Sequence, residues 1–160
     1  MADYIYPAPG NAAAEATLTV HHTSKTADAT GLAIPSLQDI TVNASNDVFT
    51  WTQLDESAKK QVATTATNSL SMNLVLEQDT FFGTSGSGGS TAAASGIMGM
   101  SIDKTIVEFD LYLGDESDGS TGKTLNGTGY VTGLAPTVSA DAPVWVSPIT
   151  ITVTGEYTIT

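Results

Sequence analysis

Residues 105–113 read TIVEFDLYL, and the alternation in this stretch decides the fold class. One set of alternate positions is apolar and consists of Val107, Phe109, Leu111 and Leu113. The set between them consists of Ile106, Glu108, Asp110 and Tyr112. Because successive side chains of a strand point to opposite faces of a sheet, the pattern predicts a β-strand over 105–113 with one buried face.

The same kind of alternation continues outward along the chain. Ser69–Leu76 (SLSMNLVL) places its leucines and Met72 on one face, which predicts a second half-buried strand. Further strands are expected at 16–22, 39–43, 48–53, 124–134 and 144–160. The turn ASND is expected to join 39–43 to 48–53, since Asn and Asp tolerate turn geometry. Pro148 cannot donate a ladder hydrogen bond, so an edge or a bulge is expected there.

Three segments lack this alternation. Residues 90–100 (STAAASGIMGM) predict one short helix of about 11 residues, N-capped by Ser90 and weakened by Gly96 and Gly99. Residues 83–90 (GTSGSGGS) predict a flexible loop. Residues 54–67 (LDESAKKQVATTAT) remain open between a short helical turn near Asp55 and an extended, threonine-rich segment.

Composition favours the same fold class. The chain has 160 residues, which is enough for one domain with its own core. It is rich in Thr, Ser, Gly and Ala, and only 14% of its residues are charged. Threonine suits a half-buried pleated surface. The predicted fold is therefore an all-β sandwich or barrel with one short helix, formed by residues 16–160 and preceded by an extended N-terminal arm over residues 1–15.

The charge balance argues against nucleic-acid binding. Seventeen acidic residues oppose five lysines, so the net charge is −12, and the chain has no arginine to grip a phosphate. Such a surface repels phosphate polyanions, so adhesive binding to DNA or RNA is not expected. The first residues contain no basic or apolar run, which predicts no conventional secretory signal. No apolar run reaches the ~18 residues of a membrane span.

Residues 119–124 (GSTGKT) resemble the glycine-rich loop that holds nucleotide phosphates. The final GKT fits that motif, but Ser117 stands where its first glycine is required. The sequence that follows, LNGTGYVTGL, predicts a strand in place of the helix whose N-terminus binds phosphate. The nearby acids Asp115, Glu116 and Asp118 would oppose a phosphate. We therefore predict an acidic connection between two strands and no nucleotide site.

No cofactor, metal site or catalytic machinery is expected. The chain has no cysteine, and His21 and His22 are adjacent on a predicted strand, so their rings point to opposite faces and cannot share one metal. The acids at 115–118 do not have the spacing of an EF-hand calcium loop. Glu108 and Asp110 share one strand face, but two acids alone specify no reaction.

The order of the segments carries further information. It runs through SLSMNLVLEQDTFFG, the short helix STAAASGIMGM, the strand TIVEFDLYLG and the glycine-spaced GTGYVTGLAPTVSADAPVWVSPITITVTGEYTIT. This arrangement resembles the major tail tube protein of long-tailed (siphovirus-like) bacteriophages. The resemblance covers roughly residues 48–160 and is one of layout, without catalytic signatures.

The resemblance implies a structural virion protein, made in the cytoplasm of a host bacterium. Copies of such a protein associate with one another in rings, typically six-fold, and the rings stack into a hollow tube that also contacts other tail proteins. DNA passes through this lumen without specific binding, and no membrane is involved. A net charge of −12 suits such a conduit, since an acidic wall repels DNA.

On this interpretation two groups of residues have expected places. Glu108 and Asp110, on the polar face of strand 105–113, are expected to line the lumen. The loop residues Asp115, Glu116, Asp118 and Lys123 are expected at the contact between neighbouring subunits or rings.

Three other interpretations stay open. The chain is alternatively another virion structural protein, such as a capsid decoration protein or a tail terminator. A β-sandwich adhesion or carbohydrate-binding module would need clustered exposed aromatics, whereas Trp51 and Trp145 are expected in the core. An enzyme is the least favoured interpretation.

Overall fold

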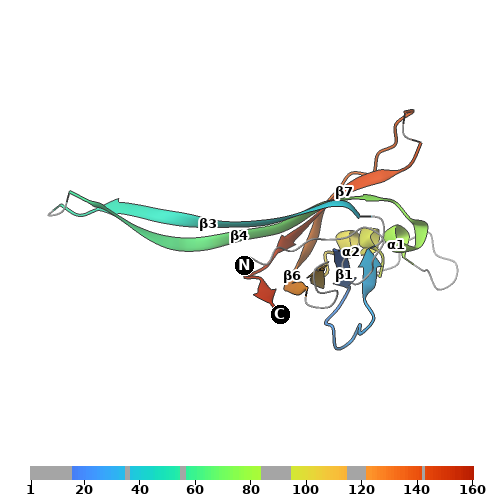
Figure 1. Ribbon diagram of the computed structural model, residues 1–160, viewed down its shortest axis with the longest axis horizontal. Helices are drawn as coiled ribbons and strands as arrows, with labels where there is room; N and C mark the ends of the chain where they lie inside the picture. The colour runs from blue at the N-terminus through green and yellow to red at the C-terminus, as the bar shows by residue number, and fades with distance from the viewer. Residues whose placement is uncertain (1–15, 35–36, 55–56, 84–94, 115–121, 142) are drawn as a thin grey trace, which may run out of the picture.

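The computed structural model describes residues 16–34, 37–54, 57–83, 95–114, 122–141 and 143–160. Within these ranges the chain forms one antiparallel sheet and two short helices (Figure 1). The strands are β1 (Thr17–His21), β2 (Leu32–Ile34), β3 (Leu37–Thr52), β4 (Lys59–Val75), β5 (Val107–Leu113), β6 (Lys123–Leu134), β7 (Val146–Val153) and β8 (Thr158–Ile159). The helices are α1 (Gln78–Phe82) and α2 (Ile97–Asp103). The predicted all-β class is confirmed. The predicted arm, residues 1–15, lies outside the described residues.

The strand order of the sheet is β2-β1-β5-β6-β7-β4-β3, and β8 pairs with β6. β7 and β8 follow one another along β6, because Gly129 pairs with Val153 and Leu125 pairs with Ile159. Between them the chain turns at Gly155, whose φ of 88° lies in the region that side chains disfavour. The predicted strand 144–160 is therefore two strands.

The core lies on one face of the sheet, where the helices pack. β5 contributes Val107, Phe109 and Leu111, all buried, as the alternation predicted. α2 adds Ile97 and Met100, and α1 adds Phe81. The remaining buried side chains come from β1, β2, β4, β6 and β7: Leu18, Val20, Ile34, Leu70, Met72, Leu74, Val131, Ile149, Ile151 and Val153. The opposite face of the sheet carries mostly polar residues.

β3 and β4 form one long hairpin, which corrects one prediction and decides between two alternatives in a second segment. The expected strands 39–43 and 48–53 are a single strand, because ASND does not turn the chain. A register shift between Asn46 and Val48 lies there instead. Residues 59–67, which were open between helix and extended chain, belong to β4. The ladder pairs Leu37 with Leu74 at one end and Thr52 with Lys59 at the other. The predicted turn at ASND is therefore wrong, because pairing with β4 keeps the chain extended there.

The helical and proline predictions also need correction. The helix predicted over 90–100 is α2, which spans Ile97–Asp103; residues 84–94 lie outside the described part. α1 was not predicted, since five residues hold too little helical periodicity to detect. β7 lies inside the sheet, so Pro148 is not on an edge strand. It pairs with Asn73 of β4, and on its other side the β6 ladder ends at Ile149, so no partner there needs its missing N–H.

Candidate interaction surfaces

The polar face of the sheet carries both predicted acids. Glu108 lies between His21 of β1 and Thr128 of β6, and Asp110 lies between Thr19 and Asn126. Further along this face the neighbouring strands carry serine, threonine and asparagine side chains: Ser69, Ser71, Asn73, Thr132, Thr150 and Thr152. The result is a broad hydroxyl-rich surface with few charges.

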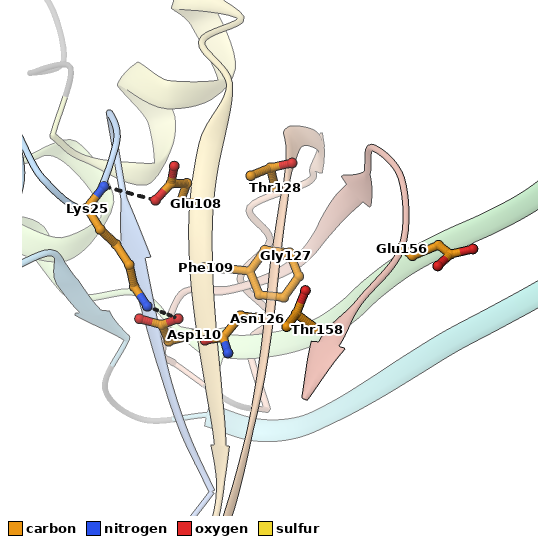
Figure 2. Close-up of a pocket in the computed structure, with 9 residues that line it drawn as sticks. All are labelled: Lys25, Glu108, Phe109, Asp110, Asn126, Gly127, Thr128, Glu156 and Thr158. Carbon is orange, nitrogen blue, oxygen red and sulfur yellow. Dashed lines mark hydrogen bonds and ion pairs between the residues drawn. The ribbon is translucent and has the colours of Figure 1, made fainter. Parts of the chain in front are cut away.

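Lys25 binds both predicted acids (Figure 2). Its backbone N–H donates to Glu108 Oε2 at 2.9 Å, and its ammonium pairs with Asp110 Oδ1. The His21 ring also contacts Asp110, with 3.3 Å between Nε2 and Oδ2. Around this cluster lies a pocket of 270 Å³, which Asn126, Thr128, Glu156 and Thr158 also line (Figure 2). The two acids therefore hold the segment 22–31 against β5, and one of them is neutralised there.

Asp28 closes that segment. Its carboxylate accepts hydrogen bonds from the backbone N–H groups of Gly31 (3.2 Å) and His22 (3.2 Å), and His22 Nδ1 lies 2.8 Å from Oδ2. Burial raises the pKa of Asp28, but the hydrogen bonds from Gly31 and His22 outweigh it and hold this pKa below the usual 3.8. The Asp28 carbonyl in turn lies 2.7 Å from His21 Nδ1. Residues 22–31 are thus a fixed loop, held by side chains.

The outer part of the β3–β4 hairpin carries an exposed apolar surface. Phe49 and Trp51 stack with 5.9 Å between ring centroids, and Val62 is the ladder partner of Phe49. Phe49 is 59% exposed, Val62 50% and Trp51 36%. In Figure 1 this hairpin extends well away from the rest of the molecule. We call Phe49, Trp51 and Val62 the hairpin patch.

A second apolar surface lies near α1 and α2. It is a groove of 490 Å³, lined by Leu76, Glu77, Gln78, Phe81, Phe82, Met98, Pro136 and Trp145. Phe82 and Trp145 are about half exposed, at 49% and 53%. We call this the helix groove. Trp51 and Trp145 were both expected in the core, and this prediction is wrong: each is on the surface, at one of these two apolar sites.

The phosphate-loop-like GKT does not precede a helix. Its lysine, Lys123, is the first residue of strand β6. The described residues contain no cluster of three His, Asp or Glu side chains that could hold a metal ion. Within those residues, no helix has the length and apolar character to cross a membrane.

Solved structures with the same architecture come from tail-like particles. A chain from the tail of an empty gene transfer agent particle, solved with C6 symmetry, matches with a TM-score of 0.62 at 13% identity, over 89% of this chain and 95% of that chain. A chain from the sheath/tube terminator of an extracellular contractile injection system gives 0.57 at 14% identity, over 97% of both chains. A chain from the tube-terminating cap of the anti-feeding prophage gives 0.56 at 13%, over 100% of this chain and 95% of that chain.

The chain has the fold of these tail-particle proteins. At this level of identity the likeness is one of fold. No protein-family model and no curated protein matches the sequence.

Within this tail-protein fold, the predicted site residues are only partly brought together. Glu108 and Asp110 share one face as expected, but the sequence gave no sign of Lys25 between them. Lys123 is exposed at the start of β6, opposite Leu113. Asp115, Glu116 and Asp118 lie outside the described residues. The hairpin patch was missed, although alternating aromatic residues in VFTWT, so close to the polar residues LDES in the sequence, are a signal for an exposed apolar strand end.

Proposed function

We propose that this chain is a structural subunit of a tail tube, in which copies of the chain form rings and the rings stack around a hollow lumen. The fold shared with chains of tail and injection-system particles supports this proposal. The observation that carries it is the β3–β4 hairpin. From Thr41 to Thr52 every residue of β3 is exposed, and the outer part of β4 is almost equally exposed.

In an isolated chain the outer part of this hairpin contributes nothing to the core. Yet it presents an apolar patch and, along β3, the unpaired edge of the sheet. A long unpaired edge is a template for pairing with another chain, and natural proteins usually protect it. A repeated head-to-tail contact that closes on itself gives a ring, and one that does not close gives a stack. We propose that each ring has six-fold symmetry, in line with the C6 symmetry of the gene transfer agent tail.

In this tube the hydroxyl-rich face of the sheet would form the lumen wall, with Glu108 and Asp110 on it. The wall has little to hold a nucleic acid, because Lys25, the lysine that lies beside these acids, is already paired with Asp110. DNA would then slide along serine and threonine hydroxyls under the repulsion of an acidic protein. Lys123, with the acidic loop Asp115, Glu116 and Asp118, is proposed to lie at a contact between subunits.

Solution mass tests the proposal directly. Multi-angle light scattering of the purified chain over a range of concentrations is expected to show species that are large multiples of 16.4 kDa and grow with concentration. A 16.4 kDa monomer at all concentrations would contradict it. The terminator alternative has the same fold support, from the sheath/tube terminator and the terminating cap. It predicts a single ring mass that does not increase further.

A further inference from the structure

The hairpin patch and the helix groove lie at opposite ends of the molecule. In Figure 1 the outer ends of β3 and β4 lie at one end of the long axis, whereas α1 and the segment leading into β7 lie near the other. β3 beyond Val42 alone extends on the order of 30 Å. The two apolar surfaces therefore cannot meet within one chain, and each is left half exposed.

The two surfaces are complementary in chemistry. The hairpin patch offers two stacked aromatic rings with a lysine beside them, because Lys60 is the ladder partner of Trp51. The helix groove offers Phe82, Met98 and Trp145 as its apolar wall and Glu77 at its rim. Methionine and aromatic side chains pack well against aromatic rings. Lysine is scarce in this chain, with five in 160 residues, so a lysine beside one apolar surface and an acid at the rim of the other make a specific pair of opposite charges.

The dimensions of the groove also fit. Sites that hold a drug-sized molecule have volumes of about 300–1,000 Å³, and the helix groove measures 490 Å³. It therefore has room for an aromatic side chain and its neighbour.

The hairpin is held at its base, which limits the entropy lost on docking. The Tyr157 hydroxyl hydrogen is shared between the carbonyls of Asn43 (2.9 Å) and Ser69 (3.0 Å), one on each strand of the hairpin. The Asn68 side chain donates to the Gly155 carbonyl at 2.7 Å. These bonds fix the direction in which the hairpin leaves the sheet. A segment that is already oriented binds at a lower entropic cost than a loose one.

We propose that the hairpin patch of one copy docks into the helix groove of the next copy, with Lys60 against Glu77. The contact is heterologous, because different surfaces of two identical chains meet, so it repeats from copy to copy. This inference rests on the proposed tube function and names the surfaces that join its subunits.

Crosslinking tests the contact, and the absence of cysteine makes the chain suitable for it. Gln53 follows the last residue of β3, two positions beyond Trp51, and its side chain accepts a hydrogen bond from Lys60 Nζ at 2.7 Å. Gln78 lines the groove. The double variant Gln53→Cys/Gln78→Cys, treated with a short bismaleimide, is expected to give a ladder of covalent multimers on a denaturing gel. The matched control is Thr50→Cys/Gln78→Cys, in which the first cysteine lies on the opposite face of the hairpin. This control is expected to give no ladder.

Charge exchange gives a second readout. Lys60→Glu is expected to raise the concentration needed for assembly by roughly 2- to 5-fold, the range of a single ion pair. Glu77→Lys should raise it by at least as much, because it also removes the acceptor of the Thr80 hydroxyl, which lies 2.8 Å from Glu77 Oε2. The double variant Lys60→Glu/Glu77→Lys should restore assembly, because the pair is re-formed with its signs exchanged.

The outcomes separate this contact from the proposed function. Tubes that form without the Gln53–Gln78 ladder, or with equal ladders from the Thr50 control, would overturn the docking contact and leave the tube function standing. A specific ladder from a chain that makes no tube would support the contact and contradict the function. Charge variants whose defects add instead of cancelling would also overturn the contact.

Discussion

Replacing Phe49 with alanine should weaken association between copies without weakening the fold. Complete burial of such a side chain is worth about 1.5–3 kcal/mol relative to leaving it exposed. Phe49 is 59% exposed in the isolated chain, so burying the remainder at a contact is worth roughly 1–2 kcal/mol. Loss of that amount corresponds to an assembly concentration about 5- to 30-fold higher.

The effect on unfolding should be much smaller. Phe49 contacts Trp51 on the outer hairpin and no residue of the core. Surface substitutions of this kind usually change the free energy of unfolding by less than about 0.5 kcal/mol. By contrast, Phe109→Ala removes a ring that is 1% exposed and should cost about 3–5 kcal/mol. We therefore expect Phe49→Ala to impair assembly more than stability, whereas Phe109→Ala should reduce the free energy of unfolding.

Two assays on each variant measure this difference. Sedimentation across a dilution series gives the concentration at which large species form, and urea unfolding followed by near-UV circular dichroism gives stability. Thr50→Ala is the matched control, since Thr50 is the next residue along β3 and faces away from the patch. If Phe49→Ala assembled at the wild-type concentration, or if Thr50→Ala were equally impaired, the hairpin patch would not be a contact surface.

Three other substitutions test separate parts of the structure. Gly127→Val should destabilise the fold by several kcal/mol in urea unfolding, because a Cβ at this position would lie 2.6 Å from the Phe109 ring; unchanged stability would contradict the packing described. Asp28→Asn should lower the free energy of unfolding at pH 7 but change it little at pH 3. The Asp28 carboxylate, whose pKa is lowered in the folded state, stabilises the fold above its usual pKa of 3.8, and this stabilisation is lost as the pH falls through the folded-state pKa. A loss of stability that is the same at both pH values would show that the charge is not responsible. Glu108→Cys should react with a bulky maleimide polymer in dissociated subunits and be protected in assembled tubes if Glu108 faces the lumen, whereas equal rates would place it outside.

Short-range alternation carried most of the fold prediction. The strand 105–113 and its buried face were predictable because one face packs on a core and the other does not, which leaves a period of two in the sequence. Where both faces are exposed, as in the outer hairpin, that signal disappears. The turn residues ASND then suggested a break, although the partner strand β4 keeps β3 extended through them.

The interaction surfaces were harder to predict for a related reason. A tryptophan is usually buried, so Trp51 and Trp145 were assigned to the core. Their exposure follows from the hairpin that extends beyond the sheet and from the segment before β7, and both depend on long-range pairing. Lys25 was missed beside Glu108 and Asp110 because a fixed loop about 80 residues distant in sequence brings it there.

Electron microscopy of the purified chain in negative stain tests the central claim most directly. The tail-tube account predicts hollow cylinders made of stacked rings, with six-fold symmetry in end-on views and a lumen wide enough for duplex DNA. Phe49→Ala should need a higher concentration to form them. Isolated particles without a central channel, at every concentration at which the chain remains in solution, would contradict the account.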